Sequence, residues 1–288
     1  MMRKVGIVTD STACIPEELV AKYDICIVPL MIIFEGKSYR DGIDMSPSEV
    51  YRIMRRRENL PTTSTPSAGD FLGAYRRLSE QAESILCITL TSQQSKIYDT
   101  ALVARDVAKE VLTNTAIDVL DSRAVGGALG LIVLEAARAA SQGADMAQVA
   151  EVARGMMPRV HFIAMLDTLF YLARTGRTGR AQAWAGSLLK IKPVVEHATS
   201  TGETMPVARP RTKTKAVKQL MDIMAERVGD SPVHVIVHHA DELEDGEKLK
   251  ADIASRFNCV ELYLTEFTPG MGVHAGPGVL AITFYTEE

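Results

Sequence analysis

Short apolar runs alternate with longer amphipathic runs along the first half of the chain. Three apolar runs have the length and continuous hydrophobicity of buried strands, namely 5–9, 85–90 and 116–120. Each is followed by a run with helical periodicity, namely 17–22, 97–111 and 125–140. Strands that alternate with helices in this order predict an α/β fold with a parallel sheet.

Each of these strands ends on a polar pair. The pairs are Thr9-Asp10, Thr91-Ser92 and Asp121-Ser122. The carboxyl ends of parallel strands lie at one edge of a sheet, and ligands of such folds bind there. We therefore expect the three polar pairs to lie close together at the functional edge.

The second half of the chain has its own set of elements. A helical run over 146–157 is closed by Pro158, and a strand over 160–164 begins a new unit. The expected elements that follow are helices at 166–173, 182–189, 211–227 and 243–256 and strands at 191–196, 233–237, 260–265 and 279–285. Because 288 residues exceed the usual size of one domain, we predict two lobes, 1–158 and 159–288.

Composition and charge narrow the function classes. A net charge of −4 and an aromatic content of 6% argue against a nucleic-acid partner. No apolar run is long enough to span a membrane, and the N-terminal apolar run is too short for a signal-peptide core, which predicts a cytoplasmic protein. The cysteines are scattered singly, as expected for reduced thiols rather than disulfides or a zinc site.

Nucleotide and metal motifs are missing from the sequence. There is no phosphate-loop pattern, and the glycines around Met271 do not have dinucleotide-binding spacing. His238 and His239 are adjacent in a predicted strand, so they point to opposite faces and are poorly placed to hold one metal ion. We therefore predict no cofactor and no metal.

The richest cluster of hydroxyl side chains lies between two prolines, Pro61 and Pro66, and continues to Ser67. Ser67 is the expected N-cap of a helix over 68–78. First-turn N–H groups and these hydroxyls together would favour a carboxylate or phosphate. The alternative interpretation is that the hydroxyls only cap the helix.

Two further segments have candidate binding chemistry. Residues 174–180 place three arginines among glycines, which suits phosphate or carboxylate recognition, although surface solvation alone also explains them. His274 is predicted in a tight turn before the last strand, where Gly276 would let backbone and ring approach a ligand. A purely structural histidine is the alternative. Asp10 fits either a phosphoryl-accepting nucleophile or a carboxylate that orients nearby hydroxyls.

These motifs occur together in the order typical of one family. They comprise Thr9 to Thr12, Pro61 to Ser67, Asp121-Ser122, Leu166 to Leu169 with Gly176-Arg177, Lys192-Pro193, Arg211 and His274 to Gly278. Over nearly its whole length the chain resembles the bacterial DegV family. The resemblance implies a two-lobed fold, with an N-terminal three-layer α/β/α lobe on a parallel sheet and a C-terminal α/β lobe on a mixed sheet. It also implies a fatty-acid-binding protein with the acyl chain buried in a tunnel.

The resemblance also assigns roles to individual residues. Thr62 and Ser92 would bind the ligand carboxylate, with Thr63, Ser64, Ser95, Gly276 and His274 around it. Arg177 and Arg211 match arginines that the family associates with phosphoryl transfer or kinase docking. Two departures bear on the headgroup site: Thr65 replaces a glutamine, and Lys96 replaces a glycine.

Three functions follow as hypotheses. The first is a non-catalytic carrier that presents a long-chain fatty acid to a separate ATP-dependent kinase subunit, a role that allows transient membrane contact. The second is a free-standing hydrolase or phosphotransferase that uses Asp10 or Ser92. The third is a ligand-sensing regulator that contacts a partner through the arginines at 52–57, which otherwise form a solvated helix face.

Overall fold

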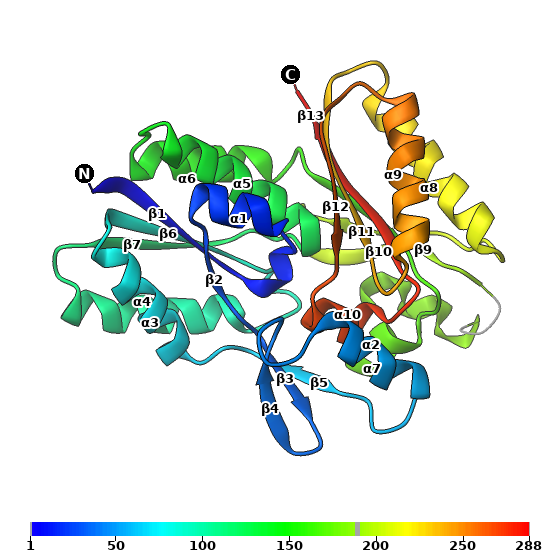
Figure 1. The fold of residues 1–288 in the computed structure, drawn as a ribbon, viewed down its shortest axis with the longest axis horizontal. Helices are drawn as coiled ribbons and strands as arrows, with labels where there is room; N and C mark the ends of the chain where they lie inside the picture. Colours follow the sequence, from blue (N-terminus) through cyan, green and yellow to red (C-terminus); the bar gives the residue numbers. More distant parts are fainter. Residues whose placement is uncertain (1, 188–190, 288) are drawn as a thin grey trace.

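Four parallel strands form the sheet of the N-terminal half in the computed structural model, which describes residues 2–187 and 191–287. Across this sheet the order is β2 (Cys26–Val28), β1 (Arg3–Asp10), β6 (Ala82–Thr89) and β7 (Ala116–Asp121). One face packs against α3 (Ala68–Ser79) and α4 (Ile97–Val111). The other carries α1 (Glu17–Tyr23), α5 (Gly126–Ser141) and α6 (Met146–Met156) (Figure 1). The predicted three-layer lobe with a parallel sheet is confirmed.

The C-terminal half contains a mixed sheet of six strands. Its order is β10 (Glu203–Ala208), β9 (Val194–Ala198), β8 (His161–Met165), β13 (Leu280–Thr286), β11 (Val233–His239) and β12 (Cys259–Glu266). Strands β11 and β12 run parallel, and the other neighbours run antiparallel. Helices α8 (Lys213–Val228) and α9 (Leu243–Arg256) cover one face (Figure 1). The predicted mixed sheet is confirmed.

Helix α5 lies between the two sheets. It packs on β1 and β6 on one side and on β8 and β13 on the other, so every residue from 126 to 134 is apolar and buried. At two positions α5 lies so close to neighbouring atoms that only glycine fits. A Cβ on Gly127 would lie 2.0 Å from His238 Nε2, and one on Gly130 would lie 2.5 Å from the carbonyl oxygen of Ala13.

A third, small sheet was not predicted. Its antiparallel strands are β4 (Lys37–Arg40), β3 (Met31–Phe34) and β5 (Thr62–Ser64), with α2 (Pro47–Arg56) between β4 and β5. The buried side chain of Tyr51 in α2 donates its hydroxyl to the Phe267 carbonyl oxygen at 3.1 Å. This unit packs on α10 (Pro269–Ala275) and shares a hydrophobic cluster with α7 (Phe170–Thr175). The segment between β2 and α3 is therefore attached to C-terminal elements.

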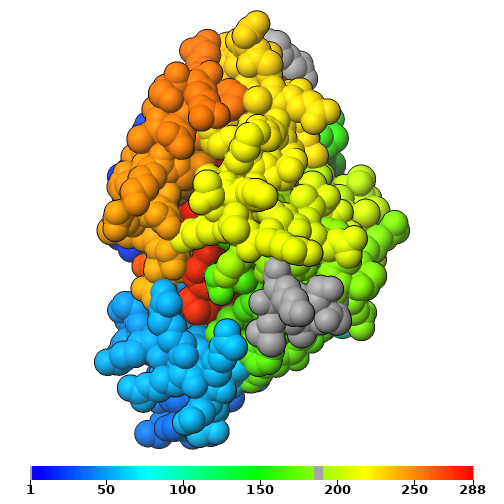
Figure 2. Space-filling model, turned by 90° about the vertical axis from the view of Figure 1, so that its right-hand side faces the viewer, coloured from blue at the N-terminus to red at the C-terminus, as the bar shows by residue number. Residues whose placement is uncertain are grey.

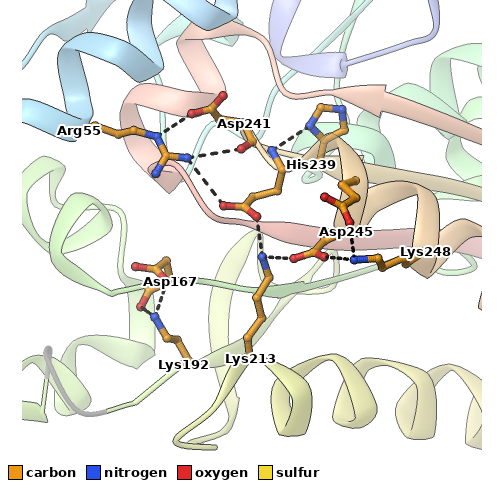
Figure 3. Close-up of polar contacts among 10 residues, drawn as sticks. Arg55, Asp167, Lys192, Lys213, His239, Asp241, Asp245 and Lys248 are labelled. Atoms are coloured by element: carbon orange, nitrogen blue, oxygen red, sulfur yellow. Dashed lines mark hydrogen bonds and ion pairs between the residues drawn. The ribbon is translucent and has the colours of Figure 1, made fainter.

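Charged side chains also join α2 to the C-terminal half. Arg55 pairs with Asp241 at 2.7 Å and Glu242 at 3.7 Å, and Lys213 pairs with Glu242 at 2.7 Å and with Asp245 (Figure 3). Figure 2 shows the exposed face where this segment (blue) lies below α8 (yellow) and α9 (orange). Because these groups are partly solvated, the pairs fix orientation more than they add stability.

Some predicted elements differ from the structure. The helix expected at 166–173 is wrong in extent: α7 begins only at Phe170, because Leu166 still pairs with the Pro193 carbonyl next to the sheet. The helix expected at 182–189 is a 3-10 helix, η2 (Gly179–Ser187), and its last two predicted residues lie outside the described residues. A short 3-10 helix, η1 (Ser11–Ala13), follows β1. The predicted lobe boundary after residue 158 falls between α6 and β8 and stays a prediction.

Candidate functional site

The polar ends of β1, β6 and β7 meet as expected. The Leu90 amide donates to Asp10 Oδ2 at 2.8 Å. The Ser92 amide donates to Asp121 Oδ1 at 3.2 Å, and the Ser122 hydroxyl donates to the Thr89 carbonyl at 2.7 Å. The three strand ends are thus held together by hydrogen bonds at one edge of the parallel sheet.

Asp10 is fully buried and hydrogen-bonded at both carboxylate oxygens. Oδ1 accepts from the amide of Thr12 at 3.0 Å and from the Thr12 hydroxyl, and Oδ2 accepts from Leu90. Burial raises the pKa of this carboxyl, and the hydrogen bonds oppose that shift. Asp10 does not line the cavity described next. Its contacts are those of a structural carboxylate that fixes η1 to β6, and they do not favour the nucleophile hypothesis.

A cavity of about 560 Å³ lies between the two large sheets and the small one. Its apolar lining comprises Leu30, Leu90, Val125, Phe162, Ala164, Leu166, Leu172, Val195, Phe267, Met271, Ala275 and Val279. Its polar lining comprises Thr12, Thr63, Ser64, Thr65, Ser92, Gln93, Gln94, Ser95, Lys96, Arg177, His197, Thr204 and His274. The cavity thus combines an apolar part with many polar groups, and a concave site that pairs apolar surface with polar groups suits a small molecule with a polar end.

A hydroxyl and an imidazole meet in the wall of this cavity. Thr63 Oγ1 lies 2.8 Å from His274 Nε2. Burial, together with the charges of Arg177 and Arg174, lowers the pKa of His274 to about 4, so the ring is neutral at pH 7. His274 Nδ1 has no hydrogen-bond partner among the described residues.

The local setting of His274 differs from the prediction. The residue lies in the last turn of α10, not in a tight turn, because Thr268 caps that helix and Pro269 occupies its first position. Gly276 ends the helix with φ of +84°, and a Cβ there would lie 2.1 Å from Tyr171 Cδ2. Gly276 is outside the cavity lining and allows close packing against Tyr171.

The hydroxyl segment also has a different geometry from the helix-mouth prediction. Thr62 to Ser64 form strand β5 and pair with β3. Ser67 does cap α3, but Asp70 completes a capping box by accepting from the Ser67 amide and hydroxyl, each at 2.7 Å. The start of α3 already holds the carboxylate of Asp70. The hydroxyls that line the cavity, Thr63 and Ser64, belong to strand β5 instead.

The candidate residues divide between the cavity and the surface. Thr63, Ser64, Ser92 and Ser95 line the cavity, whereas Thr62 is exposed and outside the lining. Strand alternation places Thr63 on the face opposite to Thr62 and Ser64, and Ser64, the last residue of β5, is exposed but still reaches the lining. The assignment of Thr62 to the ligand carboxylate stays a prediction, and the geometry offers Thr63 in its place.

The two predicted arginines are also separated. Arg177 lines the cavity and donates to the Thr175 carbonyl, whereas Arg211 is exposed and outside the lining. Nearby Arg174 donates to the carbonyl oxygens of Pro61 and Leu60 at 3.0 and 2.8 Å, which fixes the approach to β5. Arg177 therefore lies in the cavity wall, and Arg211 lies at the solvent-exposed surface.

Sequence reasoning missed several lining residues. Phe162 and Ala164 of β8, Val195 and His197 of β9 and Thr204 of β10 lie on one face of the mixed sheet. Alternating residues along β8 and β9 could have identified this face from the sequence. The opposite face is equally apolar because α8 covers it, so the pattern does not tell which face lines a cavity.

The chain belongs to the DegV family. Residues 4–287 match the sequence profile described as "Uncharacterised protein, DegV family". A DegV domain-containing protein of Caldanaerobacter subterraneus is 33% identical over 284 residues, covering 98% of this chain and 99% of the relative. Within the described residues, no helix is long and apolar enough to cross a membrane, and no group of three or more His, Cys, Asp or Glu is arranged to hold a metal.

Solved structures of relatives share the whole fold. A DegV family protein of Thermus thermophilus, described for its fatty acid binding, superposes with a TM-score of 0.88 at 29% identity, covering 99% of this chain and all of that one. DegV of Bacillus subtilis, described as a fatty acid binding protein, has a TM-score of 0.86 at 28% identity, with 99% and 100% coverage.

Proposed function

We propose that this protein binds a long-chain fatty acid in the cavity between its sheets, with the carboxylate at Thr63 and His274. The observation that carries the proposal is this hydroxyl–imidazole pair in the wall of a cavity of about 560 Å³ that also has a large apolar part. The fatty acids bound by the Thermus and Bacillus relatives support the same class of ligand.

The two parts of such a ligand gain free energy in different ways. Each methylene buried among the apolar lining residues contributes about 0.8 kcal/mol. Each charge-assisted hydrogen bond to the carboxylate contributes about 1.5–3 kcal/mol. The acyl chain therefore dominates affinity, and the polar groups determine which end of the ligand lies at Thr63.

His274 can orient the Thr63 hydroxyl. In the tautomer protonated at Nε2, the imidazole donates to Thr63 Oγ1, so the threonine proton is available to a carboxylate oxygen. Arg177 adds a positive charge to the same wall. An arriving carboxylate would raise the pKa of His274 and strengthen this arrangement.

We further propose that the protein acts as a fatty-acid carrier. The bound carboxylate would be presented to a separate kinase subunit that forms an acyl-phosphate, as the family resemblance implies. Exposed Arg211, which has no place in the cavity, is the candidate for the kinase contact. Arg177 would instead belong to the ligand site.

Stearate titration by calorimetry tests the ligand site. We expect Thr63→Ala to weaken binding by about tenfold to a hundredfold, the loss of one bond to a charged group. Thr62→Ala is the matched control, because Thr62 is the adjacent strand residue and is exposed. Equal losses in both variants, or no binding of stearate by the wild type, would contradict the proposal.

A reconstituted kinase assay separates the two arginines. We expect Arg177→Ala to lower stearate affinity and Arg211→Ala to leave it unchanged while reducing acyl-phosphate formation. Unchanged acyl-phosphate formation by Arg211→Ala would remove that residue from the kinase contact and leave the fatty-acid site intact.

A further inference from the structure

Two segments without any apolar residue meet between the halves of the molecule. On the N-terminal side the segment is 91–96, the loop between β6 and α4. On the C-terminal side it is 199–204, which comprises the turn between β9 and β10 and the start of β10. Every residue in both segments is Thr, Ser, Gln, Lys, Gly or Glu. We call the contact between these two segments the polar seam.

Neutral hydrogen bonds join the two sides of the polar seam. Gln94 Nε2 donates to Thr204 Oγ1 at 3.1 Å, and Thr91 Oγ1 donates to the carbonyl oxygen of Gly202 at 3.4 Å. The two sides are in close contact, since a Cβ on Gly202 would lie 2.5 Å from Thr91 Oγ1. Because these groups are uncharged, water can replace each partner at a small net cost in free energy.

Apolar packing holds the halves together at two other junctions. Helix α5 places buried residues against both large sheets, and the small sheet shares a hydrophobic cluster with α7 and α10. Separation at either junction would expose apolar surface to water, which is unfavourable in proportion to the area exposed. The polar seam can therefore open while these two junctions stay packed.

The polar seam is also part of the cavity wall. Residues 92–96 line the cavity from one side of the seam, and Thr204 lines it from the other. Ser92 and Ser95 are among the predicted ligand residues, so the seam lies beside the polar end of the cavity. A fatty acid that entered here would pass its methyl end first, and its carboxylate would stay among the polar lining residues.

We propose that the polar seam is the gate through which the fatty acid enters and leaves the cavity, and that the Gln94–Thr204 hydrogen bond keeps this gate closed. The inference rests on the proposed fatty-acid function. Elements that move to admit ligands come from the least stable parts of a fold, and a seam of neutral hydrogen bonds has that property. Gln94 then controls how fast the ligand exchanges, whereas Thr63 and His274 control how tightly it is held.

The test is stopped-flow measurement of the binding and release of cis-parinaric acid, a fluorescent fatty acid. In Gln94→Ala the closed state loses one neutral hydrogen bond, so the association and dissociation rate constants should each rise about twofold to tenfold. Kd should stay unchanged, because both rate constants scale with the same fraction of open molecules. Thr204→Val removes the same hydrogen bond from the other side, keeps the shape of the side chain, and should give the same result.

Two further variants separate gate opening from ligand contact. Arg55→Ala removes a link between α2 and the C-terminal half that is outside the cavity lining, so both rate constants should keep their wild-type values. Thr63→Ala should raise the dissociation rate constant and Kd together, as expected for a residue that bonds the carboxylate.

A disulfide across the polar seam tests the gate within one protein. A Cβ on Gly202 would lie 3.4 Å from Gln93 Cβ, close to the spacing of about 3.5–4.5 Å that a disulfide needs. In the double variant Gln93→Cys with Gly202→Cys, oxidation should arrest exchange of parinaric acid, and dithiothreitol should restore it. Mass spectrometry verifies the bond, and oxidised Gln93→Cys alone is the control.

The outcomes are distinct. A wild type that binds no fatty acid contradicts the fatty-acid function itself. Binding by the wild type, with unchanged rate constants in both Gln94→Ala and Thr204→Val or equally fast exchange with the disulfide formed and reduced, overturns the gate alone. A rise in the dissociation rate constant and Kd without a rise in the association rate constant would make Gln94 a ligand contact, and would also overturn its role in the gate.

Discussion

Asp10, which is buried, and His274, which is partly buried, are polar residues near the junction of the sheets, but their hydrogen bonding differs. Asp10 has donors on both carboxylate oxygens and no access to the cavity. His274 has one partnered nitrogen, one nitrogen without a partner among the described residues, and a place in the cavity wall. A buried polar group with complete hydrogen bonding holds the fold, whereas His274 supports a cavity hydroxyl, Thr63, whose proton is available to a ligand.

The strongest challenge to this comparison is removal of the Asp10 carboxylate. Asp10→Ala leaves the Thr12 and Leu90 amides without their acceptor, and we expect the free energy of unfolding to fall by about 3 kcal/mol. Urea denaturation measures this loss, with Asp10→Asn as a milder control that keeps one acceptor. Stearate affinity of the folded fraction should be unchanged; a stable variant that had lost binding would assign Asp10 to the ligand site.

His238 extends the comparison to a buried group that has no hydrogen-bond partner among the described residues. It is fully buried beside Gly127, and neither ring nitrogen has a partner among the described residues. Burial lowers its pKa from 6.5 to about 3, so below pH 6.5 the unfolded chain takes up a proton that the folded chain refuses. Stability contributed by the neutral ring is therefore lost as the pH falls from 6.5 toward 3.

We expect His238→Leu to remove this pH dependence. Relative to the wild type, the variant should gain about 2 kcal/mol of unfolding free energy between pH 7 and pH 5, since 1.5 pH units below 6.5 are involved. Urea titrations at both pH values measure the difference. Parallel pH profiles for the two proteins would show that His238 does not contribute to acid sensitivity.

His274 should show the opposite balance of effects from Asp10. We expect His274→Ala to lower stearate affinity about tenfold, because the Thr63 hydroxyl loses its orienting partner, while unfolding free energy changes by less than about 1 kcal/mol. His274→Gln, which retains an amide near the Nε2 position, should recover part of the affinity. A large stability loss with unchanged affinity would make His274 a structural residue like Asp10.

The smallest effect is expected at the exposed ion pairs. Arg55→Ala removes the link from α2 to Asp241 and Glu242, whose side chains are partly solvated (Figure 3). We expect a loss of about 0.5 kcal/mol in thermal or urea unfolding, which high salt should abolish. A salt-independent loss several times larger would show that this surface network is as important to the fold as the buried Asp10 contacts.

Local patterns predicted the architecture well because they involve neighbouring residues. The apolar runs that became β1, β6 and β7 and their polar ends needed only strand length and helix periodicity to be recognised. Ser67 was recognisable as a cap for the same reason. Strands β3 to β5 were missed because each has only three or four residues, too few to show a period.

The sequence by itself determined the alternating sheet and helix order, the hydroxyl-rich segment and the family resemblance. The tertiary structure decided which hydroxyl enters the cavity, because β5 turns Thr63 inward and leaves Thr62 exposed. It also separated Arg177 from Arg211 and brought Gln94 against Thr204. These outcomes depend on contacts between residues far apart in the chain, such as Thr63 with His274, which no local pattern encodes.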